Sequence, residues 1–171
     1  EFLPFEKILR RIGLKNITNN YQSYSSGEKR KIIELKKFNF SVKLLPLICY
    51  EIIYSGNIFE DRNFDFIVNI SEDGWFGQSI GPHQHFAHSI YRSIESGKYV
   101  LRSANNGIAA IINPLGVVEK KVDLNNSGYV DLIESKKINP TVFSKYGNKI
   151  FMLIILLYIS LIFSFNRIKN E

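Results

Sequence analysis

The chain has 171 residues, of which 45% are hydrophobic and 13% aromatic, and its formal net charge is +6. These values suit one compact domain and exclude an intrinsically disordered chain. A single cysteine excludes an internal disulfide and a cysteine-based zinc site. No stacking platform of aromatics interleaved with arginines accompanies the basic charge, so we expect no nucleic-acid partner and favour proximity to a membrane.

The first third of the chain alternates polar loops with short apolar runs. Residues 1–13 predict a loop that enters a short amphipathic helix, and the polar residues 16–28 predict a surface loop. Three strands are expected next, at residues 32–35, 38–44 and 47–49. The only methionine is Met152, so we expect the chain to be a fragment of a longer protein.

The middle of the chain predicts an α/β domain with a mixed sheet. We expect a short helix at 51–59, a strand at 65–70, a long loop at 71–82 and a helix at 83–96 that is closed by Gly97. A strand at 99–103, a hairpin of 108–112 with 117–122, and a last strand at 128–133 follow. Strands that alternate with helices indicate the α/β class.

The C-terminal run of residues 150–165 contains no charged side chain. As a helix its 16 residues span ~24 Å, slightly less than the ~30 Å hydrocarbon core, and flanking residues can extend it into the interface. We therefore predict a transmembrane helix at 149–166 between a domain at 1–148 and a short polar tail at 167–171. A buried core helix is the alternative, although such a helix usually keeps a polar face.

Cys49 ends an apolar run that predicts a buried strand, and Tyr50 and Glu51 follow it directly. A thiol at the carboxyl end of a strand is where an α/β enzyme presents a nucleophile. A lone cysteine in that position is also often a small buried hydrophobic residue. The local pattern leaves both interpretations open.

Trp75 and Phe76 lie in the long loop after the strand at 65–70, among glycines and outside any periodic apolar pattern. Such aromatics either plug the loop locally or contact an apolar substrate. His83, His85 and His88 do not form a metal-binding motif, because only the last two share one face of the predicted helix. We expect structural roles for these histidines and no metal site.

Several separated motifs occur in one order: ICYEI at 48–52, DFIVNISEDGWFG at 65–77, Gly81-Pro82 with QHF at 84–86, and LRSANNG at 101–107. This order closely resembles the carbon-nitrogen hydrolase (nitrilase) superfamily. Within it, the chain is most similar to the branch of membrane-bound N-acyltransferases that modify lipoproteins. The resemblance implies the C-terminal part of a nitrilase-like α-β-β-α sandwich followed by one transmembrane helix, and a nucleophilic role for Cys49.

What the resemblance implies about activity is acyl transfer without a cofactor. A phospholipid donates an acyl chain, Cys49 carries it as a thioester, and the amine at the N-terminus of a diacylglyceryl-cysteine lipoprotein accepts it. The implied location is the bacterial inner (plasma) membrane, with the catalytic domain facing the periplasm. A nitrilase-like amidase that acts on a small amide and an inactive membrane-anchored remnant are the alternatives.

Site residues follow from the same resemblance. Cys49 and Glu51 match catalytic positions, while Glu1 and Tyr50 match residues around the active site, and Trp75 with Phe76 is expected to contact acyl chains. The general-base glutamate and the lysine of the family's triad are expected upstream of Glu1, so we expect residues 1–171 alone to be inactive. Glu72 stands where the family usually has asparagine.

Overall fold

The computed structural model describes residues 11, 28, 30–38, 40–56 and 63–169. Contacts divide the chain into two compact units, Glu1–Arg30 and Lys31–Glu171. The elements described below all belong to the second unit. The helix expected within 1–13 and the loop expected at 16–28 lie, apart from residues 11 and 28, outside the described residues, as does Glu1.

Within the described residues, a mixed sheet of six strands in the order of the sequence forms the centre of the second unit. Its strands are β1 (Ile33–Lys37), β2 (Phe40–Ile48), β3 (Phe66–Glu72), β4 (Tyr99–Asn105), β5 (Ala109–Ile112) and β6 (Val118–Val122). The strands β2, β3 and β4 are parallel, and the outer pairs β1–β2, β4–β5 and β5–β6 are antiparallel. The mixed α/β sheet predicted from the sequence is confirmed.

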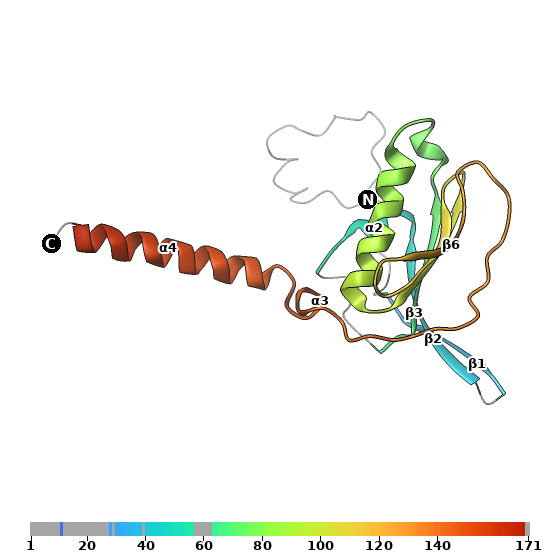
Figure 1. Cartoon of the computed structure of the whole chain (residues 1–171), viewed down its shortest axis with the longest axis horizontal. Coiled ribbons are helices and arrows are strands. Elements are labelled where there is room, and N and C mark those ends of the chain that lie inside the picture. Colours follow the sequence, from blue (N-terminus) through green and yellow to red (C-terminus); the bar gives the residue numbers. More distant parts are fainter. Residues whose placement is uncertain (1–10, 12–27, 29, 39, 57–62, 170–171) are drawn as a thin grey trace. The chain divides into compact units, whose positions relative to one another are not determined.

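One helix, α2 (Gly81–Ser96), lies across one face of this sheet (Figure 1). Pro82 stands in its first turn and Gly97 ends it with a φ of 67°, in agreement with the local signals in the sequence. Alternate strand residues face the helix and form the core, which includes Leu47, Ile67 and Val100, all 0% exposed. Burial of these side chains holds the helix on the sheet.

The carboxyl ends of β2, β3 and β4 meet at one edge of the sheet, because parallel strands run in the same direction. The register pairs Ile48 with Ile70 and Glu72 with Asn105. Residues just beyond these strand ends are therefore neighbours although they are far apart in sequence. In open α/β sheets this edge is where ligands bind.

Several boundaries differ from the sequence predictions. The strands expected at 38–44 and 47–49 are one strand, β2, because Pro46 is accommodated within it. Of the helix expected at 51–59, residues 51–53 belong to a 3-10 turn, η2 (Cys49–Ile53), residues 54–56 are not helical, and 57–59 lie outside the described residues. The strand expected at 128–133 is absent from the described structure, where this segment is extended but pairs with no described strand. A short helix that was not predicted, α3 (Val142–Tyr146), begins after Thr141, whose side chain accepts a hydrogen bond from the backbone N–H of Ser144.

The described residues supply one sheet layer and one helix layer of the expected sandwich. On the sheet face opposite α2, Ile48 and Ile70 are 57% and 55% exposed. Their exposure contrasts with the fully buried residues on the face that α2 covers.

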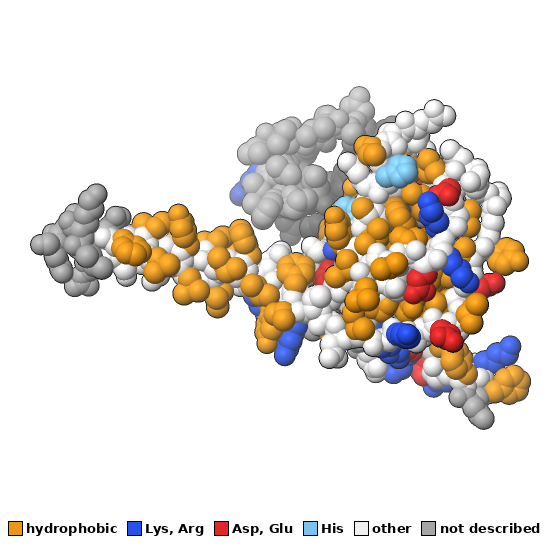
Figure 2. Space-filling model, viewed as in Figure 1, with side chains coloured by type: hydrophobic (Ala, Val, Ile, Leu, Met, Phe, Trp, Pro, Cys, Tyr) orange, Lys and Arg blue, Asp and Glu red, His pale blue; other side chains and the backbone are white. Residues whose placement is uncertain are grey.

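The apolar C-terminal run is a single helix, α4 (Lys149–Lys169), of 21 residues. Hydrophobic side chains cover its described length (Figure 2), and most of them are exposed. Among residues whose side chains are described, which end in α4 at Phe165, no helix is long and apolar enough to cross a membrane. The prediction that this C-terminal run is helical is thus confirmed.

Candidate active site

Cys49 follows directly on the carboxyl end of β2 and opens the turn η2. Its φ is +48°, in the left-handed region that residues with a side chain seldom adopt. Such a conformation costs about 1–2 kcal/mol, so surrounding contacts must hold it. The half-buried thiol is therefore presented on a strained turn at the edge where three parallel strands end.

Three side chains hold the backbone of this turn. The Glu51 carboxylate accepts a hydrogen bond of 2.7 Å from the backbone N–H of Ile48. The Asn69 amide donates to the carbonyls of Leu47 and Cys49, at 2.9 and 3.2 Å. His85 Nε2 lies 3.2 Å from the same Cys49 carbonyl oxygen. The Cys49 carbonyl is thus held by nitrogen atoms from β3 and from α2.

Behind the turn lies a buried polar network centred on Asp73, which is 0% exposed. Its carboxylate accepts hydrogen bonds from the Ser71 hydroxyl at 2.7 Å and from the Arg102 guanidinium at 2.7 Å, and it lies 2.8 Å from His85 Nδ1. Arg102 also donates to the side-chain oxygen of Asn69. This network, formed by Asn69, Ser71, Asp73, His85 and Arg102, links β3, α2 and β4 beneath Cys49.

The charges within the network are paired. Burial by itself raises the pKa of Asp73, but hydrogen bonds from His85 and Ser71 and the charge of Arg102 outweigh it and lower the pKa to about 2. Burial lowers the pKa of Arg102, and the Asp73 carboxylate opposes that shift. An ionised Asp73 therefore faces a guanidinium inside the fold.

The network also reaches the sulfur atom. Ser71 Oγ lies 3.7 Å from Cys49 Sγ as well as 2.7 Å from Asp73 Oδ1. The hydroxyl has one proton, which can point either to the carboxylate or to the sulfur. Ser71 thus connects the thiol to the buried ion pair.

The backbone of Gly107 packs closely against the side chain of Asp73, and a substitution can test this contact. A Cβ on Gly107 would lie 2.8 Å from the Cβ of Asp73 and closer still to its carboxylate. We expect Gly107→Ala to displace Asp73 and to destabilise the fold by about 1–3 kcal/mol, because the packed surroundings cannot take up the methyl group. The midpoint of thermal unfolding of the full-length protein measures this.

Gly128→Ala is the control, since its Cβ would meet only the two Val122 methyl groups, at 3.3 and 3.5 Å. Equal midpoints for the two alanine variants would contradict the tight packing behind Asp73.

Most of the described site residues predicted from the sequence lie near one another, and Trp75 is more exposed than the others. Cys49, Tyr50 and Glu51 lie together in the turn, and the Phe76 ring approaches the rings of Tyr50 at 6.5 Å and His85 at 5.7 Å. Trp75, in the short turn η3 (Gly74–Phe76), is 84% exposed and so does not plug its loop.

Glu72, which stands where the family usually has asparagine, holds the loop after β3. Its carboxylate accepts hydrogen bonds from the Asn105 amide and from the backbone N–H of Gly74, and these contacts lower the pKa of Glu72. An acidic side chain at this position therefore joins the ends of β3 and β4.

The network was not predicted as a unit. Asn69, Ser71 and Asp73 alternate along and just beyond β3, so the two-residue period of a strand places them on one face. That alternation of polar residues in an otherwise apolar strand is a signal that sequence analysis could have used. Arg102 and His85 carry no comparable local signal.

A cavity of about 560 Å³ adjoins the turn and runs along α2. Aromatic and imidazole side chains line it together with aliphatic, amide and small ones: Tyr50, Phe76, Ser79, Ile80, Gly81, Gln84, His85, Ala87, His88 and Tyr91. Aromatic walls with a few polar groups are typical of ligand sites. This cavity shares Tyr50 with the Cys49 turn and His85 with the network.

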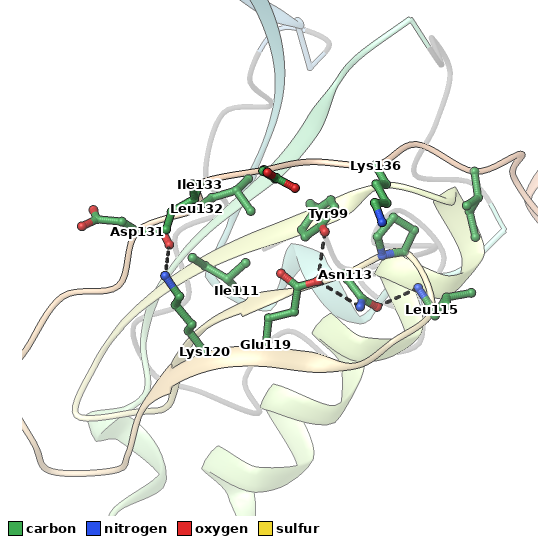
Figure 3. Close-up of a pocket in the computed structure, with 13 residues that line it drawn as sticks. Tyr99, Ile111, Asn113, Leu115, Glu119, Lys120, Asp131, Leu132, Ile133 and Lys136 are labelled. Carbon is green, nitrogen blue, oxygen red and sulfur yellow. Dashed lines mark hydrogen bonds between the residues drawn. The ribbon is translucent and has the colours of Figure 1, made fainter.

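A second cavity, of about 570 Å³, lies between the hairpin of β5 and β6 and the extended segment that follows (Figure 3). Tyr99 donates a hydrogen bond to Glu119 across it, and Lys120 donates to the carbonyl of Asp131. None of its lining residues belongs to the Cys49 turn or to the buried network. Of these two cavities, the first is the one that adjoins the Cys49 turn.

The three histidines occupy different environments. His83 is exposed, His85 is buried in the network, and His88 is half-buried with its ring 6.1 Å from that of Tyr91. Within the described part of the chain, no group of three or more His, Cys, Asp or Glu side chains is arranged to hold a metal ion.

The sequence profile of carbon-nitrogen hydrolases matches residues 8–133, which is most of the chain and includes the turn and the network. The chain belongs to the carbon-nitrogen hydrolase family. An amidase of the nitrilase superfamily from Nesterenkonia AN1 has 13% sequence identity and a TM-score of 0.44, over 60% of this chain and 41% of that one.

Curated relatives in the carbon-nitrogen hydrolase family share more of the sequence. An apolipoprotein N-acyltransferase of Rickettsia bellii is 44% identical over 141 residues, which is 81% of this chain and 28% of that protein. The apolipoprotein N-acyltransferase of Rickettsia prowazekii is 38% identical over 173 residues, covering 100% of this chain and 34% of that protein. The chain thus spans about a third or less of the length of these relatives.

Proposed function

We propose that the protein to which this chain belongs is an apolipoprotein N-acyltransferase, which transfers an acyl chain from a phospholipid to the N-terminal amine of a diacylglyceryl-cysteine lipoprotein. The observation that carries the proposal is Cys49, the only cysteine, on a strained turn at the ligand-binding edge of a carbon-nitrogen hydrolase sheet. The names of the Rickettsia relatives support the choice of reaction.

The proposed reaction has two steps. The Cys49 thiolate attacks the ester carbonyl of the phospholipid, a thioester bond forms, and the lysophospholipid leaves as an alcohol after taking up a proton. The lipoprotein amine then attacks the thioester, an amide bond forms, and the thiol is released. A thioester suits this order because it forms from an oxygen ester and yields readily to an amine.

Both steps pass through a tetrahedral intermediate whose oxyanion needs donors. The backbone N–H of Tyr50 follows the nucleophile directly and is a candidate donor. We assign the general-base glutamate and the second donor, a lysine, to the part of the relatives' length that this chain does not span. Glu51 supports the site by holding the N–H of Ile48, at the start of the turn.

The cavity beside the turn is the proposed place for acyl chains. Tyr50 and Phe76 form apolar walls next to the nucleophile, and the exposed Trp75 stands on the same loop as Phe76. An exposed tryptophan near an apolar cavity suits contact with lipid, since its ring is large and amphipathic.

The proposed location is the bacterial inner membrane, with the catalytic domain on the periplasmic side. In this assignment residues 1–148 form the hydrolase-like domain, 149–166 the membrane anchor and 167–171 a polar tail. Support comes from α4, whose uncharged run 150–165 extends ~24 Å at 1.5 Å per residue, and whose helical residues on either side can reach from the ~30 Å hydrocarbon core into the interface. Leu156, Phe163 and Phe165 are among its side chains that are more than 60% exposed, an arrangement that fits lipid better than water.

Replacement of Ile155 tests the anchor. Ile155→Arg places a charge near the centre of the helix, which costs ~2.5–3.5 kcal/mol on insertion scales, so we expect membrane integration of α4 to fall sharply. Glycosylation sites placed on both flanks of α4 report which side of the membrane each flank occupies. Ile155→Leu is the matched control, and flanks on the same side in the unmutated protein would contradict a span.

The activity itself is tested with the full-length protein in detergent. Incubation with phospholipid and a synthetic diacylglyceryl-cysteine peptide should yield the triacylated peptide, detected by mass spectrometry. Hydrolysis of small amides without acyl transfer would instead indicate an amidase. Inactivity toward both substrates would indicate a remnant and would remove the proposal.

A further inference from the structure

His85 connects the buried ion pair to the backbone of the nucleophile. Its side chain, 2% exposed, extends from α2 with Nδ1 2.8 Å from Asp73 and Nε2 3.2 Å from the carbonyl oxygen of Cys49. Arg102 and Ser71 hold Asp73 in turn. The imidazole is thus held at Nδ1 by Asp73, while Nε2 faces the Cys49 carbonyl in the turn.

The Cys49 carbonyl belongs to the same planar peptide group as the N–H of Tyr50. In a trans peptide the C=O and the N–H point in opposite directions, and the described chain contains no cis peptide bond. A carbonyl held towards His85 and Asn69 therefore directs the N–H of Tyr50 away from the buried network.

The turn needs such a restraint because the φ of Cys49 is +48°. Without it, the peptide can rotate and the N–H of Tyr50 loses its direction. The thiol is less affected, since it branches from the Cα atom before that peptide and keeps its own contact with Ser71.

We propose that His85 is a positioning residue of the acyl transfer, which orients the peptide between Cys49 and Tyr50 so that its N–H binds the oxyanion. This inference rests on the proposed function, because it assigns a role within the same reaction. The proposed role predicts that two properties of Cys49, its acylation and its alkylation, respond differently to the loss of His85. Formation of the acyl-enzyme depends on His85, whereas the reactivity of the thiol with an alkylating agent, which forms no oxyanion, does not.

The test compares wild type, His85→Ala, His85→Gln and His83→Ala in the full-length protein. Two acyl donors are used: a phospholipid, and p-nitrophenyl acetate, from which the thiolate displaces p-nitrophenolate as the acetyl thioester forms. Alkylation by iodoacetamide is followed by mass spectrometry on the peptide that contains Cys49. Thermal unfolding is recorded for each variant, and His83, exposed on the same helix, serves as the matched control.

We expect His85→Ala to slow acylation by either donor on the order of 10²-fold, as loss of an oxyanion contact or a misplacement of about 1 Å does, with little change in KM. Alkylation should stay within about threefold of wild type on this account, since it needs no oxyanion donor. His85→Gln should recover at least about tenfold of the loss, because its amide can donate to the Cys49 carbonyl. His83→Ala should behave as wild type.

The role is overturned if His85→Ala acylates at the wild-type rate, if alkylation falls as much as acylation, or if His85→Gln recovers nothing while remaining folded. A wild type that reacts with the nitrophenyl ester but not with phospholipid removes the proposed donor and leaves the comparison of the variants intact. A wild type that reacts with neither removes both proposals.

Discussion

Cys49→Ala in the full-length protein is expected to abolish acyl transfer, with no triacylated peptide above background. Without the sulfur no thioester can form, and the two steps of the reaction have no shared carrier. Because Cys49 is half-buried and its thiol contacts Ser71 only at 3.7 Å, the loss of the sulfur should hardly change the unfolding midpoint. Mass spectrometry of the wild type incubated with phospholipid alone should find the acyl group on Cys49.

Cys49→Ser sharpens this experiment. It keeps the shape of the side chain but replaces a thiol with a hydroxyl that is far harder to deprotonate, so we expect nearly the same loss. Full turnover by the alanine variant would remove Cys49 as the nucleophile, and an acyl group found on another residue would do the same.

Asp73→Asn is expected to have the largest effect on stability. The substitution leaves the guanidinium of Arg102, whose side chain is 0% exposed, without its counter-charge. Breaking a buried ion pair by removing one partner costs about 3–5 kcal/mol. Guanidinium-induced unfolding of the full-length protein in detergent measures the loss, and the exposed Asp131→Asn should change the free energy of unfolding by no more than about 0.5 kcal/mol.

The stability lost in Asp73→Asn should become smaller as the pH falls. The pKa of Asp73 is about 2 in the fold, against an ordinary value of 3.8. A carboxylate with a lowered pKa contributes its full stability above the ordinary value and loses it as the pH falls through the folded value. The difference between wild type and Asp73→Asn should therefore shrink by about 2 kcal/mol between pH 7 and pH 2.

A double variant distinguishes the effect of the charge of Arg102 from the effect of its hydrogen bonds. Arg102→Met added to Asp73→Asn removes the orphaned cation, so part of the lost stability should return. A double variant less stable than Asp73→Asn alone would show that Arg102 matters mainly through its bonds to Asn69 and to the Ile108 carbonyl.

The sequence predicted the elements whose signals are local. Pro82 and Gly97 mark the two ends of α2, because proline suits the first turn of a helix and glycine adopts the left-handed conformation that ends one. The compact β-rich run of β3 and the turn between β5 and β6 were equally local signals. Cys49 was identified from its place after an apolar run and from the order of the motifs around it.

Other predictions failed where a strand needed a partner. Residues 128–133 have the alternation of a strand, but in the described structure they pair with no strand, and Lys120 reaches the carbonyl of Asp131 with its side chain instead. A strand is completed by hydrogen bonds to a neighbour, and no local pattern specifies whether that neighbour is present. The helical turn η2 ends at Ile53 because the backbone of Tyr54 is extended and Gly56 is left-handed, with a φ of 74°, so the helix predicted from residue 51 does not continue through residues 54–56.

By itself the sequence determined the class of fold, the helix and strands with strong local signals, and the one residue able to act as a sulfur nucleophile. The tertiary structure decided how that residue is held. Residues 69, 85 and 102 come from three elements, and only parallel pairing of β2, β3 and β4 under α2 brings them to the Cys49 carbonyl and to Asp73. The physical reason is that each buried polar group had to find its hydrogen-bond partner across the sheet, at separations that no sequence period encodes.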